Sequence, residues 1–159
     1  MIQEITHDGL LLCDIQANTF EQSIQLACSS EVFIRRFMNS EVATEFDSLA
    51  FLDDTKTIQD VYDDLKKQYG EFNYGSTKFS TQALFWIGYI YRYFCFTYNL
   101  SSKTAYKLIK PNELNEAYLP YHTLDPVNAI DRLLEEKNIS FKDEDFFKRS
   151  YEIFKKNRL

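Results

Sequence analysis

The chain of 159 residues contains little glycine and little proline, only 4 and 3 residues respectively. Sheets of long strands joined by tight hairpins need these residues in their turns, so their scarcity argues against an all-β fold. The four glycines are also isolated, and none lies in a G-x-x-x-x-G-K or G-x-G-x-x-G pattern. Nucleotide binding through a glycine-rich phosphate loop is therefore not expected.

Cysteine and histidine are similarly scarce, with 3 and 2 residues. Cys13, Cys28 and Cys95 show no C-x-x-C spacing and stand among apolar residues, which indicates reduced core thiols in a cytoplasmic protein. His7 and His122 are far apart in the sequence, so neither a metal site nor another cofactor is expected. The R-x-x-x-x-H pattern of helical ribonucleases is also missing.

A basic excess is lacking too, because 18 Lys and Arg stand against 24 Asp and Glu, for a net charge of -6. This balance argues against nonspecific binding to a nucleic-acid backbone and suits a basic partner. The most apolar stretch, residues 79–100, contains Gln82, Arg92 and Asn99 and is rich in Tyr rather than Leu. We therefore expect a buried helix there and no membrane span.

What the chain does have is aromatic residues, 14 Phe and 11 Tyr, with helical spacing almost throughout. Between residues 81 and 98 the aromatics surround the helix axis, which predicts a central helix. Arg92 must then pair with a carboxylate or carbonyl or reach water, since an unpaired buried guanidinium is very costly. The sequence predicts an all-α fold, a single compact multi-helix domain over residues 1–159, with residues 1–18 irregular and a subregion break near 71–79.

Several helix boundaries can be predicted from capping residues. Thr57 and Asp60 resemble a helix start and Gly70 ends that helix. Residues 120–124 are expected to be nonhelical, after which Asp125 caps a helix that begins with Pro126. A terminal helix is predicted from acids at residues 143–145 and bases at 155–158, which match the helix dipole. Phe20, Ile24 and Cys28 also share a helical spacing.

The candidate catalytic residues each have a structural alternative. His122 with Asp125 forms a possible acid–base pair, but a capping Asp125 and a hydrogen-bonded structural His122 are favoured. Cys95 is a weak candidate nucleophile because an apolar setting raises the pKa of a thiol. We therefore expect no enzymatic activity. Carboxylates at residues 53–64 form an acidic cluster that either docks a basic partner or is a solvated face.

A helix-turn-helix is the main alternative to a protein-binding role. A helix that ends near Tyr98, a turn over residues 99–102 and a second helix with Lys103, Lys107 and Lys110 have a permissible spacing. The usual small-residue turn is absent, and ordinary helix packing explains the same residues. DNA binding is thus the second hypothesis.

Four stretches resemble a group of small bacterial proteins associated with the antitoxin side of toxin–antitoxin gene pairs. They are FIRRFMNS at residues 33–40, WIGYIYRY at 86–93, the run 101–111 from Ser-Ser-Lys to Lys-Pro, and YHTLDP at 121–126. The resemblance covers about residues 31–136 and leaves out the first thirty residues and the last helix. It implies a compact helical protein that neutralises a partner toxin encoded nearby, with an ADP-ribosyltransferase-like protein as the candidate toxin, and it assigns no catalytic residues.

The preferred hypothesis is a noncatalytic antitoxin that acts by protein–protein binding. Aromatic residues and Arg commonly anchor interfaces, and acidic residues complement a basic partner. We expect an exposed aromatic patch bordered by acids, near residues 118–125 or 53–64. The candidate partner-binding residues are Arg36, Asp60, Asp63, Asp64, Tyr74, Trp86, Tyr118, Tyr121 and His122.

Overall fold

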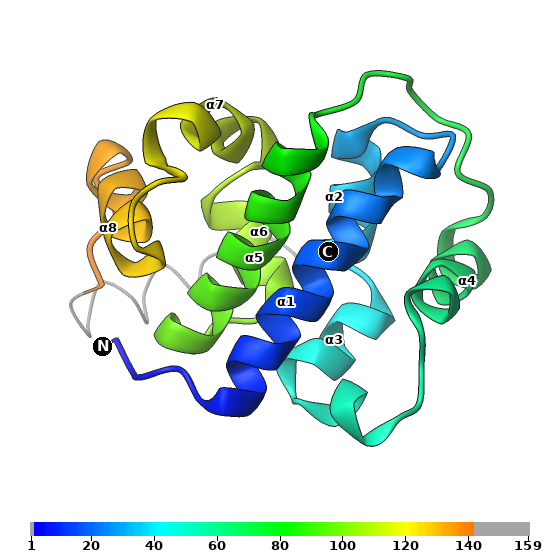
Figure 1. Cartoon of the computed structure of the whole chain (residues 1–159), viewed down its shortest axis with the longest axis horizontal. Coiled ribbons are helices and arrows are strands. Elements are labelled where there is room, and N and C mark those ends of the chain that lie inside the picture. The colour runs from blue at the N-terminus through cyan, green and yellow to red at the C-terminus, as the bar shows by residue number, and fades with distance from the viewer. Residues whose placement is uncertain (1, 142–159) are drawn as a thin grey trace, which may run out of the picture.

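The computed structural model describes residues 2–141, and within that range it contains α-helices, two short 3-10 helices and no strands (Figure 1). The all-α prediction is confirmed. The predicted terminal helix at 143–158 lies outside the described residues. The elements are α1 (His7–Gln22), η1 (Ser23–Gln25), α2 (Ser30–Met38), α3 (Glu41–Asp47), η2 (Ala50–Asp53), α4 (Ile58–Tyr69), α5 (Thr81–Tyr98), α6 (Ser102–Leu108), α7 (Pro111–Tyr121) and α8 (Pro126–Glu136).

Most helices begin at a hydroxyl residue whose side chain accepts a hydrogen bond from the backbone N–H three residues later. This bond satisfies one of the free N–H groups of the first helical turn. Thr57 and Asp60 form the predicted reciprocal cap of α4, and Gly70 ends that helix with a φ of 88°. The hydroxyl caps of the helices are Thr6, Ser29, Ser40, Thr57, Ser80 and Ser101.

The centre of the fold is an antiparallel pair formed by α1 and α5, with α7 and α8 on one side and α2, α3 and α4 on the other (Figure 1). Gly88 allows the two helices to approach closely. A Cβ atom at Gly88 would lie 2.8 Å from the Gln16 carbonyl oxygen and 3.0 Å from the Ala17 Cα. The Gln16 side chain also donates to the Gly88 carbonyl oxygen at 2.9 Å, so backbone contact and hydrogen bond fix the same crossing.

The helix α1 corrects the prediction of an irregular amino-terminal segment, because residues 7–18 belong to a helix packed on α5. Gln16 and Thr19 are fully buried on the side of α1 that would otherwise be purely apolar. They interrupt the apolar stripe, so the helical period is hard to recognise in the sequence. The helix also ends at Gln22, before the predicted Cys28, and the 3-10 helix η1 follows.

The loop of residues 70–80 is attached to the beginning of α2. The backbone N–H groups of Ser29 and Ser30 donate to the carbonyl oxygens of Tyr74 and Thr77, both at 3.0 Å. The Ser30 hydroxyl accepts from the backbone N–H of Phe79 at 2.9 Å. The predicted break near 71–79 is therefore a loop that packs onto a helix start.

Two predictions near the end of the described chain need correction. The helix α7 continues through Pro120 to Tyr121, so the nonhelical stretch is shorter than predicted. Pro120 lies in the exposed last turn, and its missing N–H deprives only the carbonyl oxygen of Glu116, an exposed residue, of its helical partner. Asp125 does precede α8, but its side chain makes no capping hydrogen bond.

Arg92 is fully buried in the middle of α5 and binds side chains from three other helices. Its Nε donates to the Gln16 side-chain oxygen at 2.7 Å, its Nη1 to Asp47 at 2.5 Å and its Nη2 to the Ser102 hydroxyl at 2.6 Å. Its guanidinium also lies 5.4 Å from the centres of two rings, Phe46 and Phe96. The predicted pairing of Arg92 with a carboxylate is confirmed.

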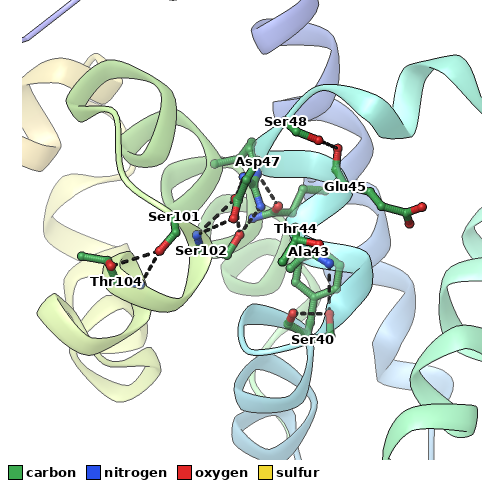
Figure 2. Close-up of polar contacts among 12 residues, drawn as sticks. Ser40, Ala43, Thr44, Glu45, Asp47, Ser48, Ser101, Ser102 and Thr104 are labelled. Atoms are coloured by element: carbon green, nitrogen blue, oxygen red, sulfur yellow. Dashed lines mark hydrogen bonds and ion pairs between the residues drawn. The ribbon is translucent and has the colours of Figure 1, made fainter. Parts of the chain in front are cut away.

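Asp47 connects the end of α3 to the beginning of α6 (Figure 2). Its two carboxylate oxygens accept from the backbone N–H of Ser102 at 3.1 and 3.0 Å, and the Ser102 hydroxyl donates to Asp47 at 2.6 Å. Every buried side-chain nitrogen and oxygen in the described residues has a hydrogen-bond partner. This network compensates the desolvation of the Arg92 charge.

The first prediction concerns the contact between α1 and α5. A Gly→Ala exchange at an open helix position stabilises by about 1 kcal/mol, but at Gly88 the new methyl group meets backbone atoms that cannot move aside. We expect Gly88→Ala to lower the free energy of unfolding by about 1–3 kcal/mol, measured by urea denaturation. Gln82→Ala, at an exposed position of the same helix, is the control and should change stability little. A Gly88→Ala protein as stable as the original would contradict the close crossing.

The second prediction concerns the Arg92 network. Asp47→Ala leaves a buried guanidinium without its carboxylate and should lower the free energy of unfolding by about 3 kcal/mol. Arg92→Met removes the charge, so Asp47→Ala should cost clearly less in the Arg92→Met background, with a coupling of about 1–3 kcal/mol. Thermal and urea unfolding of the four proteins measure this cycle. Additive losses would show that Asp47 and Arg92 do not act as a pair.

Candidate functional site

His122 has the structural role that the sequence favoured. Its Nδ1 lies 2.7 Å from the Tyr118 carbonyl oxygen, and its ring stacks on the Tyr118 ring with centroids 4.3 Å apart and an interplanar angle of 14°. Residues 2–141 contain no group of three or more His, Cys, Asp or Glu side chains that could hold a metal ion. The arrangement around His122 is that of a ring held in a surface stack.

The stack of Tyr118 and His122 continues onto α5. The Trp86 ring meets the Tyr118 ring edge to face, with centroids 6.0 Å apart at 74°. Further along α5, the rings of Tyr89 and Tyr93 stack with centroids 6.2 Å apart at 19°. We call these five residues the aromatic face: Trp86, Tyr89 and Tyr93 of α5, with Tyr118 and His122 of α7 and its C-terminal cap.

The aromatic face follows the solvent side of α5. Trp86, Tyr89 and Tyr93 are spaced by three and four residues and are half-buried, whereas their neighbours Ile87, Gly88 and Ile90 are buried. In Figure 1, α5 lies between α1 on one side and α7 and α8 on the other, so these helices border the face. Apolar side chains are also exposed on the bordering helices, namely Leu11 at 45% and Leu119 at 79%.

Carboxylates act on the tyrosines of the aromatic face from both sides. Burial raises the pKa of the Tyr89 phenol, and Cys13 and Asp14 on α1 raise it further. Burial likewise raises the pKa of Tyr93, with additional contributions from Cys13 and from Asp125 after α7. Both phenols are therefore neutral at pH 7.

Tyr121 is close to this face in sequence but serves a structural contact. Its hydroxyl donates to the Glu136 carboxylate, which joins α7 to α8. Lys137 also connects the two helices, because its Nζ lies 2.6 Å from a Glu113 oxygen. Tyr98 of α5 donates to Asp131 at 3.3 Å, so α8 is fixed to both neighbours. These contacts position α7, and with it Tyr118 and His122.

The predicted acidic cluster runs from the end of η2 into α4, and α4 lies apart from α7 and α8 (Figure 1). The Asp60 carboxylate accepts from the Thr57 backbone N–H at 2.8 Å, and this bond holds the pKa of Asp60 below its usual value. Asp64 pairs with Lys56 at 3.0 Å. Asp63 is exposed and accepts only from Gln59, its neighbour one turn earlier. Two of the three predicted acids thus have structural partners.

Arg36 and Tyr74 lie near the loop of residues 70–80. Arg36 donates to the Glu71 carbonyl oxygen at 3.1 Å and covers the rings of Tyr69 and Phe72, with ring centres 5.8 and 5.9 Å away. Tyr74 is 69% exposed, and its carbonyl oxygen binds the start of α2. Of the nine predicted residues, the structure therefore brings Trp86, Tyr118 and His122 into one contact group.

A polar groove of about 720 Å³ lies between α3 and α4. Its carboxylates are already neutralised within the chain, because Lys56 contacts Glu45 at 3.1 Å and Asp64 at 3.0 Å. The hydrogen bonds to these carboxylates raise the pKa of Lys56, so the ammonium stays charged. The groove contains no unpartnered buried polar side chain that indicates a ligand.

The helix α6, which is the candidate DNA-reading helix, begins against α3. Ser102 is buried, and its backbone N–H donates to the Asp47 carboxylate at the N-terminus of α6. A recognition helix contacts base edges with its N-terminal residues, whereas this end of α6 faces an acid inside the protein. Lys110 lies 4.4 Å from the centre of the Tyr106 ring. The N-terminus of α6 is therefore occupied by Asp47, whereas Lys103 and Lys110 are exposed, and the DNA-binding hypothesis stays a prediction.

Sequence reasoning missed Tyr89, Tyr93 and Asp14 as candidate site residues, and it considered Asp125 as a helix cap or as an acid–base partner of His122. The spacing of Trp86, Tyr89 and Tyr93 is a helical stripe, but α5 carries aromatic residues on all sides. The sequence alone therefore does not show which aromatic residues of α5 face solvent, because this depends on how the neighbouring helices pack against α5.

Searches of family models, of curated proteins and of solved structures find no match to this chain. No helix of residues 2–141 is sufficiently long and apolar to cross a membrane. Judged by its fold and site, this is an all-helical protein whose central helix carries a partly exposed aromatic face.

The third prediction concerns the cysteines. Burial raises the pKa of Cys13 and of Cys95 to about 12, although nearby Arg92 lowers both, and burial also raises the pKa of Cys28. At pH 8 almost no thiolate is present, and all three thiols are buried. We expect a thiol reagent such as dithionitrobenzoate to react with all three cysteines in denaturant and with the native protein only as fast as it unfolds. A rapidly labelled native cysteine would restore Cys95 as a candidate nucleophile.

Proposed function

We propose that this protein is a noncatalytic antitoxin, which binds a partner toxin and neutralises it by covering part of its surface. The observation that carries this proposal is the aromatic face with its carboxylate border. Aromatic side chains that are rigidly held and partly exposed are the residue type that contributes most to protein interfaces. The Trp86–Tyr118 and Tyr118–His122 ring contacts hold these side chains before any partner arrives.

Preorganised rings favour binding because little side-chain entropy is lost in the complex. Exposed apolar residues on the bordering helices enlarge the surface, and a stable complex buries about 1,200–2,000 Å² in total. Inhibition by covering needs no activated nucleophile and no tuned acid, which agrees with the structural roles of His122 and the buried thiols.

The resemblance of residues 31–136 to antitoxin-side proteins supports the biological role. Two of its four stretches, WIGYIYRY and YHTLDP, contain Trp86, Tyr89, Tyr93, His122 and Asp125, which belong to the aromatic face or its border. The partner we propose is a protein toxin encoded nearby, and the resemblance implies an ADP-ribosyltransferase-like protein for that partner. The protein would act in the cytoplasm, where such a toxin is made.

The fourth prediction tests the neutralisation. Expression of the neighbouring gene product alone should arrest growth, and co-expression of this protein should restore growth and allow the two to co-purify. A neighbouring product that is harmless alone, or equally toxic with and without this protein, would refute the antitoxin proposal.

Variants then locate the interface. His122→Ala and Trp86→Ala should raise the dissociation rate of the complex about 10- to 100-fold and weaken growth rescue, measured by biolayer interferometry and plating. Asp63→Asn on α4 is the control and should leave both unchanged, because Asp63 is exposed and remote from the face. Thermal unfolding of each variant verifies the fold. Normal rescue by both aromatic variants would place the interface elsewhere.

A further inference from the structure

The helices α1, α5 and α7 carry no exposed Lys or Arg, whereas the bordering helix α8 carries the exposed Arg132. Residues 1–34, which include α1, contain no Lys or Arg but five acids: Glu4, Asp8, Asp14, Glu21 and Glu31. Residues 80–102, which include α5, contain only Arg92, and that side chain is fully buried and bound to Asp47. Residues 111–131, which include α7, contain no Lys or Arg and four acids: Glu113, Glu116, Asp125 and Asp131.

The carboxylates at the border of the face are free of internal salt bridges, in contrast to Glu45 of α3 and Asp64 of α4. Asp14 and Asp125 are exposed, and no ion pair joins either side chain to a Lys or Arg of the described residues. In the groove between α3 and α4, Lys56 neutralises Glu45 and Asp64. Asp14 and Asp125 thus add unpaired negative charge beside partly exposed aromatic rings.

Asp14 lies on α1 and Asp125 immediately precedes α8, and both of these helices pack against α5. After burial as the main cause, Asp14 contributes to the raised pKa of Tyr89 and Asp125 to that of Tyr93. The stacked tyrosine rings present electron-rich faces, and such faces attract guanidinium and ammonium groups. Ring faces and carboxylates therefore favour the same kind of ligand.

We propose that the aromatic face captures a basic segment of a partner protein, whose Arg or Lys side chains lie over the tyrosine rings and pair with Asp14 and Asp125. This inference rests on the proposed function and specifies the chemistry of the partner. A nucleic acid would be repelled by these carboxylates. A second copy of this chain would bring another acidic face.

The chain carries a built-in reporter for this inference, because Trp86 is its only tryptophan and belongs to the face. The probe is a twelve-residue synthetic peptide with four arginines separated by serine and leucine. Matched peptides replace the arginines by citrulline, which is neutral and nearly isosteric, or by glutamate. Each peptide is titrated into the full-length protein while Trp86 emission is recorded.

The fifth prediction is that the arginine peptide changes Trp86 emission in a saturable manner, at least tenfold more tightly than the citrulline peptide, whereas the glutamate peptide has no effect. The double variant Asp14→Asn with Asp125→Asn should bind the arginine peptide about tenfold more weakly, and Asp63→Asn should bind it normally. Added salt should weaken the binding. Neither Asp14 nor Asp125 caps a helix through its side chain, so both variants should keep the thermal stability of the original.

Three results would overturn this inference. The first is equal binding of the arginine and citrulline peptides. The second is equal weakening of arginine-peptide binding by Asp63→Asn and by the double variant. The third is a Trp86 emission of the free protein that depends on protein concentration, which would show that a second copy binds the face. The peptide assay needs no toxin, so the two proposals fail separately. If neutralisation depends on Trp86 but the arginine peptide does not bind, only the inference of a basic partner segment is refuted. If the peptide binds but the toxin is not neutralised, only the antitoxin role is refuted.

Discussion

The burial of one charge organises this fold. Arg92 stands in the middle of the central helix, and its guanidinium needs partners on all sides because an unpaired charge in the protein interior is very costly. Gln16, Asp47 and Ser102 provide them from α1, α3 and α6. Three helices that are far apart in the sequence are thereby attached to one side chain, with a fixed rotation of α5.

That rotation determines which aromatic residues of α5 are buried. With Arg92 directed toward α1, α3 and α6, residues such as Tyr91 and Phe94 enter the core, where the Tyr91 hydroxyl donates to the Ile109 carbonyl oxygen at 2.5 Å. Trp86, Tyr89 and Tyr93 then remain on the solvent side. The same helix thus stabilises the core and presents a rigid surface, because the interactions that fix one side also fix the other.

The charge distribution adds to this division of the surface. On α3 and α4, Lys56 pairs with Glu45 and Asp64, and Asp60 takes part in the cap of α4. Around the aromatic face the acids Asp14 and Asp125 have no such role. A surface that combines preorganised rings with unneutralised carboxylates is suited to steer and hold a basic partner, which connects the structure to the proposed binding role.

The sequence by itself determined the helical class, the capping of α4 by Thr57 and Asp60, and the need of Arg92 for a partner, since these follow from local periodicity, local hydrogen bonds and the cost of a buried charge. It also indicated Trp86, Tyr118 and His122, although without their contacts. Only the tertiary structure decided that residues 7–22 form a core helix, because the buried Gln16 and Thr19 hide its apolar stripe and Gln16 finds its partners on α5 only after folding. It alone decided which side of α5 faces solvent, because a helix with aromatics all around has no preferred side until its neighbours pack against it.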